Sequence, residues 1–228
     1  MKIISQGKIF LSDQRSVTEN ERIKRYSTFN FDNIYNPAKE PIGNLYALHD
    51  DTLAPNASIN FFHREQGYVI IIPILGSIRY FDEEENQIDI EVGKSVMIFH
   101  KENSFFKLHN PYPNATISYL IIAIKSEEEH ASSPAFLDID LSKPNQLDII
   151  TRDTVPFKIG VGRFKSRGEN EYSLSPSSAL YSFVLAGVFE IDGRLLHERD
   201  GIALWATDKI EMEALSNDAI LLTIELPE

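Results

Sequence analysis

The sequence predicts an all-β protein made of two tandem β-barrel domains. Short runs of β-branched and aromatic residues recur along the chain, as is typical of strands, and no long stretch has helical periodicity. A pattern of glycines and hairpins also occurs twice, once in each half of the chain. With 228 residues, the chain is long enough for two small domains that each bury a core.

The apolar runs have the length of strands, and polar turns separate them. Two turns are clear: "DEEENQ" at 82–87 and "IDGRLL" at 191–196, where Asp192 and Gly193 form the Asp-Gly pair favoured in two-residue hairpins. The clearest strand runs are "YVIIIPIL" (68–75), "SVMIF" (95–99), "ATISYLIIAI" (115–124), "LYSFVL" (180–185) and "AILLTIEL" (219–226).

The repeated pattern is centred on four glycines. In each half an apolar strand ends at a glycine, Gly76 or Gly187, and an alternating strand and a turn follow. A second glycine, Gly93 or Gly201, then precedes another apolar strand. Any two antiparallel meanders can share glycine-punctuated hairpins, so two unrelated meanders are the alternative interpretation. The common order favours a duplicated β-barrel.

The domain boundaries are predicted from composition. The stretch "KSEEEHASSP" is acidic, rich in small residues and has nothing apolar to bury, so it is interpreted as a linker at 125–134. This gives an N-terminal domain at 1–124 and a C-terminal domain at 135–228. The first 25 residues form either an edge strand or a loose arm, and the alternation in "KIISQGKIFLS" (2–12) favours a strand pair.

Charge and composition exclude several classes of function. The formal net charge is −12, so the surface repels phosphate backbones, and we expect neither nucleic acid bound by direct charge attraction nor an anionic membrane as partner. The chain has no cysteine, which excludes disulfides, thiolate zinc sites and cysteine nucleophiles. It shows no secretory signal and no apolar run long enough to span a bilayer, so we expect a cytoplasmic protein.

Three stretches carry a resemblance to a known family. The sequences "STFNFDNIYNP" (27–37) and "IGNLYALHDD" (42–51), with the elements at Gly76 and Gly93, resemble the pirin family. The end of the chain, "DGIALWATDKIEMEALSNDAILLTIELPE" (200–228), is similar to the C-terminal domain of bacterial pirin-like quercetin dioxygenases. The resemblance covers most of the chain from residue 25 onward. It implies a bicupin, that is, two tandem jelly-roll β-barrel (cupin) domains.

The resemblance also implies a metal site, which the sequence does not preserve. In that family the first cupin domain holds iron or another divalent metal through three histidines and one glutamate. Counted without gaps, the first pair of ligand positions falls on Phe62 and Arg64, and the second pair falls on Phe106 and Leu108. The family's asparagine just beyond falls on Asn110, which matches. All four ligand positions therefore carry non-ligands, and we expect no metal cofactor.

Neighbouring residues do not obviously replace the lost ligands. Tyr68 stands where the family often has an acidic residue. His63 and His109 are each one residue out of phase with the expected ligand face, and side chains alternate across a strand. A β-bulge at both places would be needed to bring them into a metal site. We therefore interpret His63, His109 and also His49 and His100 as solvent-edge or hydrogen-bonded histidines.

The candidate site is the interior of the first barrel. The sequence predicts that this interior presents Phe62, Arg64, Tyr68, Phe106 and Leu108. These residues either fill a ligand-free core or line a small-molecule pocket. Because arginine is rarely buried without a partner, Arg64 would pair with an acidic residue such as Asp50 or Asp51, reach solvent, or hold an anionic ligand.

The function predicted first is non-catalytic: binding of a small ligand, with an anion as one candidate, or of a protein partner. The first alternative is a metal-dependent oxidoreductase of the quercetin dioxygenase type, which the resemblance alone would imply. The second alternative is a metal-independent isomerase or lyase that uses Tyr68 or His63 as acid or base. A transcriptional cofactor role, as in some relatives, would need a protein partner that the sequence does not reveal.

Overall fold

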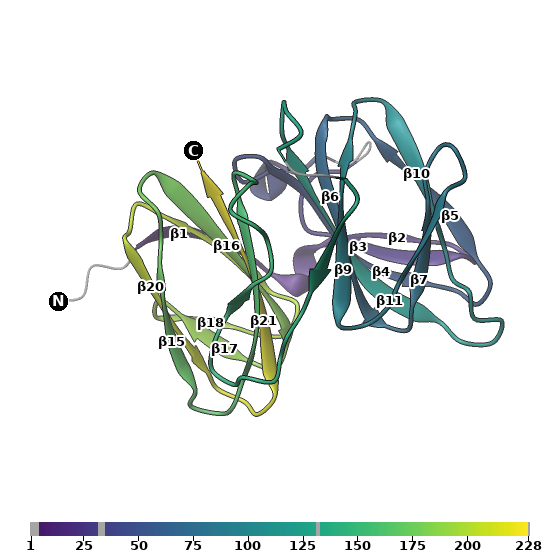
Figure 1. Ribbon diagram of the computed structural model, residues 1–228. Helices are drawn as coiled ribbons and strands as arrows, with labels where there is room; N and C mark the ends of the chain where they lie inside the picture. Colours follow the sequence, from purple (N-terminus) through teal and green to yellow (C-terminus); the bar gives the residue numbers. More distant parts are fainter. Residues whose placement is uncertain (1–4, 32–34, 131–132, 228) are drawn as a thin grey trace. The chain divides into compact units, whose positions relative to one another are not determined.

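The computed structural model describes residues 5–31, 35–130 and 133–227, and within these ranges it is built almost entirely of β-strands (Figure 1). The all-β prediction is therefore confirmed. The chain forms two compact units. The N-terminal unit is Arg15–Asp138, and the C-terminal unit is Ile139–Glu228 together with the described part of Met1–Gln14.

The N-terminal unit contains two sheets whose strands are mostly antiparallel neighbours. The large sheet consists of β2 (Ser16–Glu19), β3 (Ile23–Ser27), β4 (Leu45–Leu53), β6 (Gly67–Leu75), β9 (Lys94–His100), β11 (Ile117–Lys125) and β12 (Ala135–Asp138). The small sheet consists of β5 (Ser58–His63), β7 (Ile78–Phe81), β8 (Gln87–Ile90) and β10 (Ser104–His109). Buried residues of both sheets form one apolar core, as expected of a jelly-roll barrel.

The C-terminal unit is built in the same way. Its large sheet consists of β1 (Gln6–Phe10), β13 (Asp148–Ile149), β14 (Lys158–Phe164), β16 (Ser178–Ala186), β19 (Gly201–Trp205) and β21 (Ala219–Pro227). Its small sheet consists of β15 (Glu169–Ser173), β17 (Phe189–Ile191), β18 (Arg194–Leu196) and β20 (Lys209–Ala214). Two short 3-10 helices, η1 (Ser12–Gln14) and η2 (Pro37–Lys39), complete the elements.

The two units have the same strand order. The large N-terminal sheet runs β12-β9-β6-β11-β4-β3-β2, and the large C-terminal sheet runs β1-β19-β16-β21-β14-β13. The small sheets run β5-β10-β7-β8 and β15-β20-β17-β18. Apart from the extra strand β2, each strand has its counterpart at the same place. The predicted duplicated barrel is confirmed.

The glycines of the repeated pattern lie at equivalent turns. Gly76 follows β6 with φ +74°, and Gly187 follows β16 with φ +81°; in this left-handed region glycine is favoured because it has no Cβ. Two residues before each glycine the strand has a bulge. Ile74 has no partner on β11, and Leu185 has none on β21. The same irregularity is thus repeated in both barrels.

The domain boundaries differ from the prediction of 1–124, 125–134 and 135–228 in two places. Strand β12 continues the N-terminal sheet by pairing with β9, so the units divide after Asp138. Strand β1 pairs with β19 of the C-terminal sheet. Composition cannot reveal either feature, because each is decided by which sheet edge accepts the strand. Within the predicted linker, residues 131–132 lie outside the described residues.

Over the described part of the chain, we find no helix with the length and apolar character needed to span a membrane.

Candidate functional site

The site begins with the inward faces of β5 and β10. On β5 the buried residues are Phe61 and His63, and on β10 they are Phe106 and Leu108. These strands pair in antiparallel register, with Phe61 opposite Phe106. Residues directly opposite one another point to the same side of a sheet, so all four side chains belong to the barrel interior. The placement of Phe106 and Leu108 agrees with the sequence prediction.

Two predicted interior residues lie elsewhere. Half of the Phe62 surface is exposed, and Arg64 is also exposed. The phase predicted for β5 was therefore wrong by one residue, and His63 occupies an inward position. The backward count from Gly76 crosses the bulge at Ile74 and a turn, and each can shift the phase by one.

Tyr68 is buried, but it does not join the interior cluster of the N-terminal barrel. Its neighbour on β6, Val69, belongs to that cluster, so alternation places Tyr68 on the opposite face of the sheet. The Tyr68 hydroxyl accepts a hydrogen bond from the backbone N–H of His130 at 2.6 Å, and its ring packs edge-on against Phe99. Tyr68 is therefore not positioned as an acid or base inside the barrel.

A connected group of rings fills the interior. Phe61 stacks on Phe106 with ring centroids 5.0 Å apart, and Phe106 lies 5.0 Å from the imidazole of His100. His100 in turn lies 5.5 Å from His63. Both histidines are buried, with 7% of His100 and 0% of His63 exposed. Of the two interpretations, solvent-edge or hydrogen-bonded, the second holds for both histidines: they are buried, and each has a hydrogen-bond partner.

Each interior histidine faces a tyrosine. The Tyr46 hydroxyl is 2.6 Å from Nε2 of His63, whereas the Tyr80 hydroxyl is 3.5 Å from Nε2 of His100. Nδ1 of His63 is buried without a hydrogen-bond partner. Burial lowers the pKa of both imidazoles to about 4, so at neutral pH they are uncharged. Neither can serve as a fixed positive charge for an anion.

A second polar group lies on β3 and β4. Asp51 is fully buried and makes a two-pronged ion pair with Arg25, with contacts from 2.6 to 3.1 Å. Asp50 pairs with Arg15 at 3.1 Å. Both aspartates lie within strand β4, not in a turn, and each has an arginine partner other than Arg64. Sequence reasoning missed this pair because the two strands meet only in the fold.

His49, expected at a solvent edge or hydrogen-bonded, is buried and hydrogen-bonded, with 1% of its surface exposed. Its Nδ1 is 2.9 Å from the Ser27 hydroxyl, and Phe31 packs against its ring. Burial, and then the charge of Arg25, lower its pKa. The alternation of Ala47, His49 and Asp51 along β4 was the available signal. His109, by contrast, lies on the outward phase of β10 and contacts the Ser58 hydroxyl at 2.9 Å.

The interior does not fit the metal site that the resemblance implies. A site of three histidines and one glutamate needs four donors that point inward. The four inward positions on β5 and β10 carry Phe61, His63, Phe106 and Leu108, which together supply a single donor side chain. His100 adds a second imidazole from β9. Among the described residues, no group of three or more histidine, aspartate or glutamate side chains is arranged to hold a metal.

A pocket of about 550 Å³ opens beside these histidines. The hairpin between β7 and β8 lines one side, and the ends of β9 and β10 line the other. Among the described residues in its lining there are three carboxylates and no lysine or arginine. The residues that matter for its chemistry are Tyr80, Asp82, Glu83, Glu84, Phe99, His100 and Phe105.

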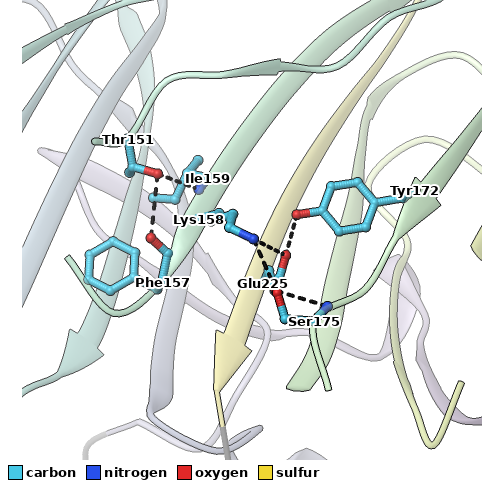
Figure 2. A network of polar contacts seen from close by, with 7 residues as sticks. All are labelled: Thr151, Phe157, Lys158, Ile159, Tyr172, Ser175 and Glu225. Carbon is cyan, nitrogen blue, oxygen red and sulfur yellow. Dashed lines mark hydrogen bonds and ion pairs between the residues drawn. The ribbon is translucent and has the colours of Figure 1, made fainter. Parts of the chain in front are cut away.

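The C-terminal unit has a polar network of a different kind, shown in Figure 2. Glu225 has only 4% of its surface exposed. Its carboxylate accepts hydrogen bonds from the Tyr172 hydroxyl at 2.5 Å, the Lys158 ammonium at 3.2 Å and the Ser175 backbone N–H at 3.2 Å. Because both carboxylate oxygens already have partners, the network is best explained as a structural link between β14, β21 and the end of β15.

The comparisons with known proteins agree with this architecture. Residues 156–226 match the family model described as the quercetinase C-terminal cupin domain. The structure of YhhW from Escherichia coli superposes with a TM-score of 0.86 at 17% identity, covering 97% of this chain and 98% of that one. The resemblance inferred from the sequence is thus confirmed. The chain has the bicupin fold, and its C-terminal domain is similar to the quercetinase C-terminal cupin domain.

Two further structures share the fold at similarly low identity. Bacterial pirin YhhW in complex with nickel(II) has a TM-score of 0.85 at 17% identity and covers 97% of this chain and 99% of that one. Quercetin 2,3-dioxygenase from Acinetobacter baumannii has a TM-score of 0.71 at 14% identity, with coverage of 97% and 79%. No curated protein matches the sequence significantly. At these identities the likeness concerns the fold, so function must be argued from the site.

Proposed function

We propose that the N-terminal barrel of this pirin-like bicupin has a degenerate metal site and binds a small ligand without catalysing its conversion. The observation that supports this most directly is the occupancy of the inward ligand positions. Phe61, Phe106 and Leu108 are buried hydrocarbon side chains there, and only His63 can donate to a metal. Dioxygen chemistry on a flavonol needs a metal with open coordination positions, and this donor set does not provide one.

The ligand is expected at the barrel mouth and not in the packed interior. The rings of Phe61, Phe106 and His100 occupy the interior, whereas the pocket of about 550 Å³ has the size of ordinary small-molecule sites. An anionic ligand held by Arg64 inside the barrel is not supported, since Arg64 is exposed directly after the end of β5. A protein partner remains the other form of a non-catalytic role.

The test restores the site. The triple variant Phe61→His, Phe106→His, Leu108→Glu recreates three histidines and one glutamate together with His63. After exposure to nickel, iron, manganese or zinc and desalting, plasma mass spectrometry should find about one metal per chain in the variant and far less in the wild type.

The matched control is Phe62→His, Phe105→His, which adds two histidines on the outward face of the same strands. We expect this control to stay as metal-poor as the wild type. If the wild type binds nearly one metal per chain and the His63→Ala variant does not, the proposal is overturned. The metal-dependent oxidoreductase would then be the better-supported function.

A metal-independent isomerase or lyase is a second candidate, favoured by the short contact between Tyr46 and His63. The neutral imidazole of His63 could act as a base and the hydroxyl of Tyr46 as its proton relay. His63 is fully buried, however, and a substrate would have to displace Tyr46 to reach it. Solvent exchange offers a check: base chemistry requires His63 to exchange its ring proton rapidly, which the buried arrangement opposes.

A further inference from the structure

We propose that the mouth pocket of the N-terminal barrel binds a small primary amine that carries an apolar body. The inference rests on the proposed non-catalytic site and assigns it a ligand class. It is carried by three features of one cavity: unneutralised carboxylates on one wall, aromatic faces on another, and a buried imidazole in the lining.

The acidic wall is the turn between β7 and β8. Asp82, Glu83 and Glu84 line the pocket, and none of the three forms an ion pair with a described residue. Their hydrogen bonds come from neutral groups: Asp82 accepts from the backbone N–H groups of Glu84 and Asn86, and Glu83 accepts from that of Phe105. The charges are therefore positioned but not compensated. A cation entering the pocket would gain attraction from all three.

Glu85, the next carboxylate in this hairpin, has its negative charge neutralised by a lysine. Glu85 pairs with Lys107 at 2.7 Å, and the Lys107 ammonium also lies over the ring of Phe81. Glu85 does not line the pocket. Lys107 is thus engaged outside the cavity, and the described lining residues include no lysine or arginine.

The aromatic wall supplies room for an apolar body. Phe105 is 44% exposed at the start of β10, and Phe99 is half-buried at the end of β9. Exposed aromatic surface beside carboxylates is the environment in which ammonium groups with hydrocarbon substituents bind, because the ring faces attract both cation and hydrocarbon. A compact inorganic cation would use none of this apolar surface.

The buried imidazole favours a primary amine over a quaternary ammonium. His100 lines the cavity with 7% of its surface exposed, and its Nδ1 has no hydrogen-bond partner among the described residues. Its contact with Tyr80, at 3.5 Å, is at the outer limit of a hydrogen bond. Nδ1 of His100 is not among the buried atoms left without a partner, so it remains accessible and keeps one hydrogen-bonding position for a ligand. An ammonium N–H is a suitable donor to an uncharged imidazole nitrogen.

The experiment is calorimetric titration with three probes of one shape: 2-phenylethylamine, 2-phenylethanol and 3-phenylpropanoate. We expect binding of the amine only, weakened by added salt. The trimethylated amine should bind less tightly, since it cannot donate to His100. Equal binding of the amine and the alcohol, or no binding of the amine, would overturn the proposal.

The variant that tests the site is Glu83→Gln, Glu84→Gln, which keeps the side-chain shape and the acceptor for Phe105. It should weaken amine binding by about tenfold, as expected for loss of two partly exposed charges. The control is Glu169→Gln, Glu190→Gln on the small C-terminal sheet, which changes the net charge equally. Equal weakening by both variants would mean non-specific attraction to a chain of net charge −12.

The same titration is repeated after treatment with chelator. If the amine still binds, both the degenerate metal site and the amine ligand are supported. If the amine does not bind to metal-free protein, only the assignment of a primary amine as the ligand is rejected. Binding that requires an added divalent metal would reject the degenerate site itself.

Discussion

At the scale of single residues, two ion pairs have the same shortest distance but differ in burial. Comparing them shows how burial changes the contribution of an ion pair to the free energy of unfolding. Arg25–Asp51 and Arg79–Asp89 both have contacts of 2.6 Å, but Asp51 is fully buried whereas half of the Asp89 side chain is exposed. Removing one partner of a buried pair leaves an uncompensated charge. We therefore expect Asp51→Asn to lower the free energy of unfolding by about 3 kcal/mol.

Asp89→Asn is the control, and it should cost less than about 1 kcal/mol, because solvent screens the exposed pair. Urea unfolding of both variants measures the difference. Similar losses in the two variants would contradict the dominance of burial.

The Tyr172 hydroxyl offers a second residue-scale test, in the network of Figure 2. Its hydrogen bond to Glu225 is charge-assisted and buried, so Tyr172→Phe should cost about 1.5–3 kcal/mol. Burial by itself would raise the pKa of Glu225, but the hydrogen bonds from Ser175, Tyr172 and Lys158 outweigh it and lower this pKa. The stabilisation is thus present above the ordinary carboxyl pKa and is lost as the pH falls through the lowered value.

Denaturant titrations at neutral and acidic pH check this expectation, since the difference between wild type and Tyr172→Phe should shrink in acid. A difference that stays constant with pH would mean that Tyr172 acts through packing alone.

The candidate site was predictable only where strand phase could be followed without interruption. The count from Gly93 reached Phe106, Leu108 and the buried Asn110 correctly, because neither the pairing of β9 with β6 nor that of β10 with β5 contains a register shift. On β5 the count crossed the bulge in β6, so each predicted inward position lies one residue after the true one. His63 was therefore assigned to the wrong face of the strand. A phase error of one residue inverts every assignment on a strand.

At the scale of elements, the edge strand β1 is expected to stabilise the C-terminal unit. Five residue pairs join it to β19, and Phe10 packs edge-on against Tyr181 with ring centroids 5.9 Å apart. Phe10 is 6% exposed, so Phe10→Ala should cost about 3 kcal/mol.

Hydrogen exchange measures where this loss is felt: amides of β19 should exchange faster, and those of β9 should not change. The control is Val17→Ala on β2, where the side chain is 48% exposed. Faster exchange confined to the N-terminal unit would contradict the pairing of β1.

The small C-terminal sheet carries an unfavourable arrangement of like charges. Glu190 lies directly opposite Glu213, which in turn lies opposite Glu169 on the next strand. Like charges at directly opposed positions are destabilising, so Glu190→Lys should stabilise the protein by about 0.5–1 kcal/mol. Glu198→Lys, a change of equal charge on an exposed glutamate outside the strands, is the control. Equal gains from both variants, measured by thermal unfolding, would attribute the effect to net charge instead.

Strand content and the duplicated order could be predicted because local patterns encode them: apolar alternation, Asp-Gly turns and repeated glycines. The sheets that β1 and β12 join could not be predicted from the sequence. Each edge strand is short and lies next to one unit in sequence while it pairs with the sheet of the other. Which sheet edge it joins depends on distant residues, and the pattern of a short strand does not specify them.

At the scale of the whole molecule, two units of one topology have opposite distributions of buried histidine. His49, His63 and His100 are buried in the N-terminal unit, whereas His197, the one histidine of the C-terminal unit, is exposed. Burial lowers the pKa of all three, to about 4 for His63 and His100. Duplication preserved the strand order, while the interior chemistry of the two barrels diverged.

This asymmetry predicts that mild acid destabilises one unit selectively. An unfolded histidine binds a proton below about pH 6.5, but the folded N-terminal unit resists protonation until about pH 4. Between these values the unfolded state binds more protons than the folded state. The free energy of unfolding therefore decreases as the pH is lowered. Burial raises the pKa of Asp51, which acts in the opposite direction but is a single group against three.

The measurement is hydrogen exchange in β6 and its counterpart β16 at about pH 7 and about pH 5, corrected for the intrinsic pH dependence of exchange. Protection should fall in β6 and hold in β16, because the lowered pKa of Glu225, the carboxylate of the C-terminal network, means that it titrates only at lower pH. The double variant His63→Gln, His100→Gln replaces the two histidines of the barrel interior. It should remove most of the pH dependence of protection in β6. Equal loss of protection in both strands would mean that the titrating groups lie outside the buried histidines of the first barrel.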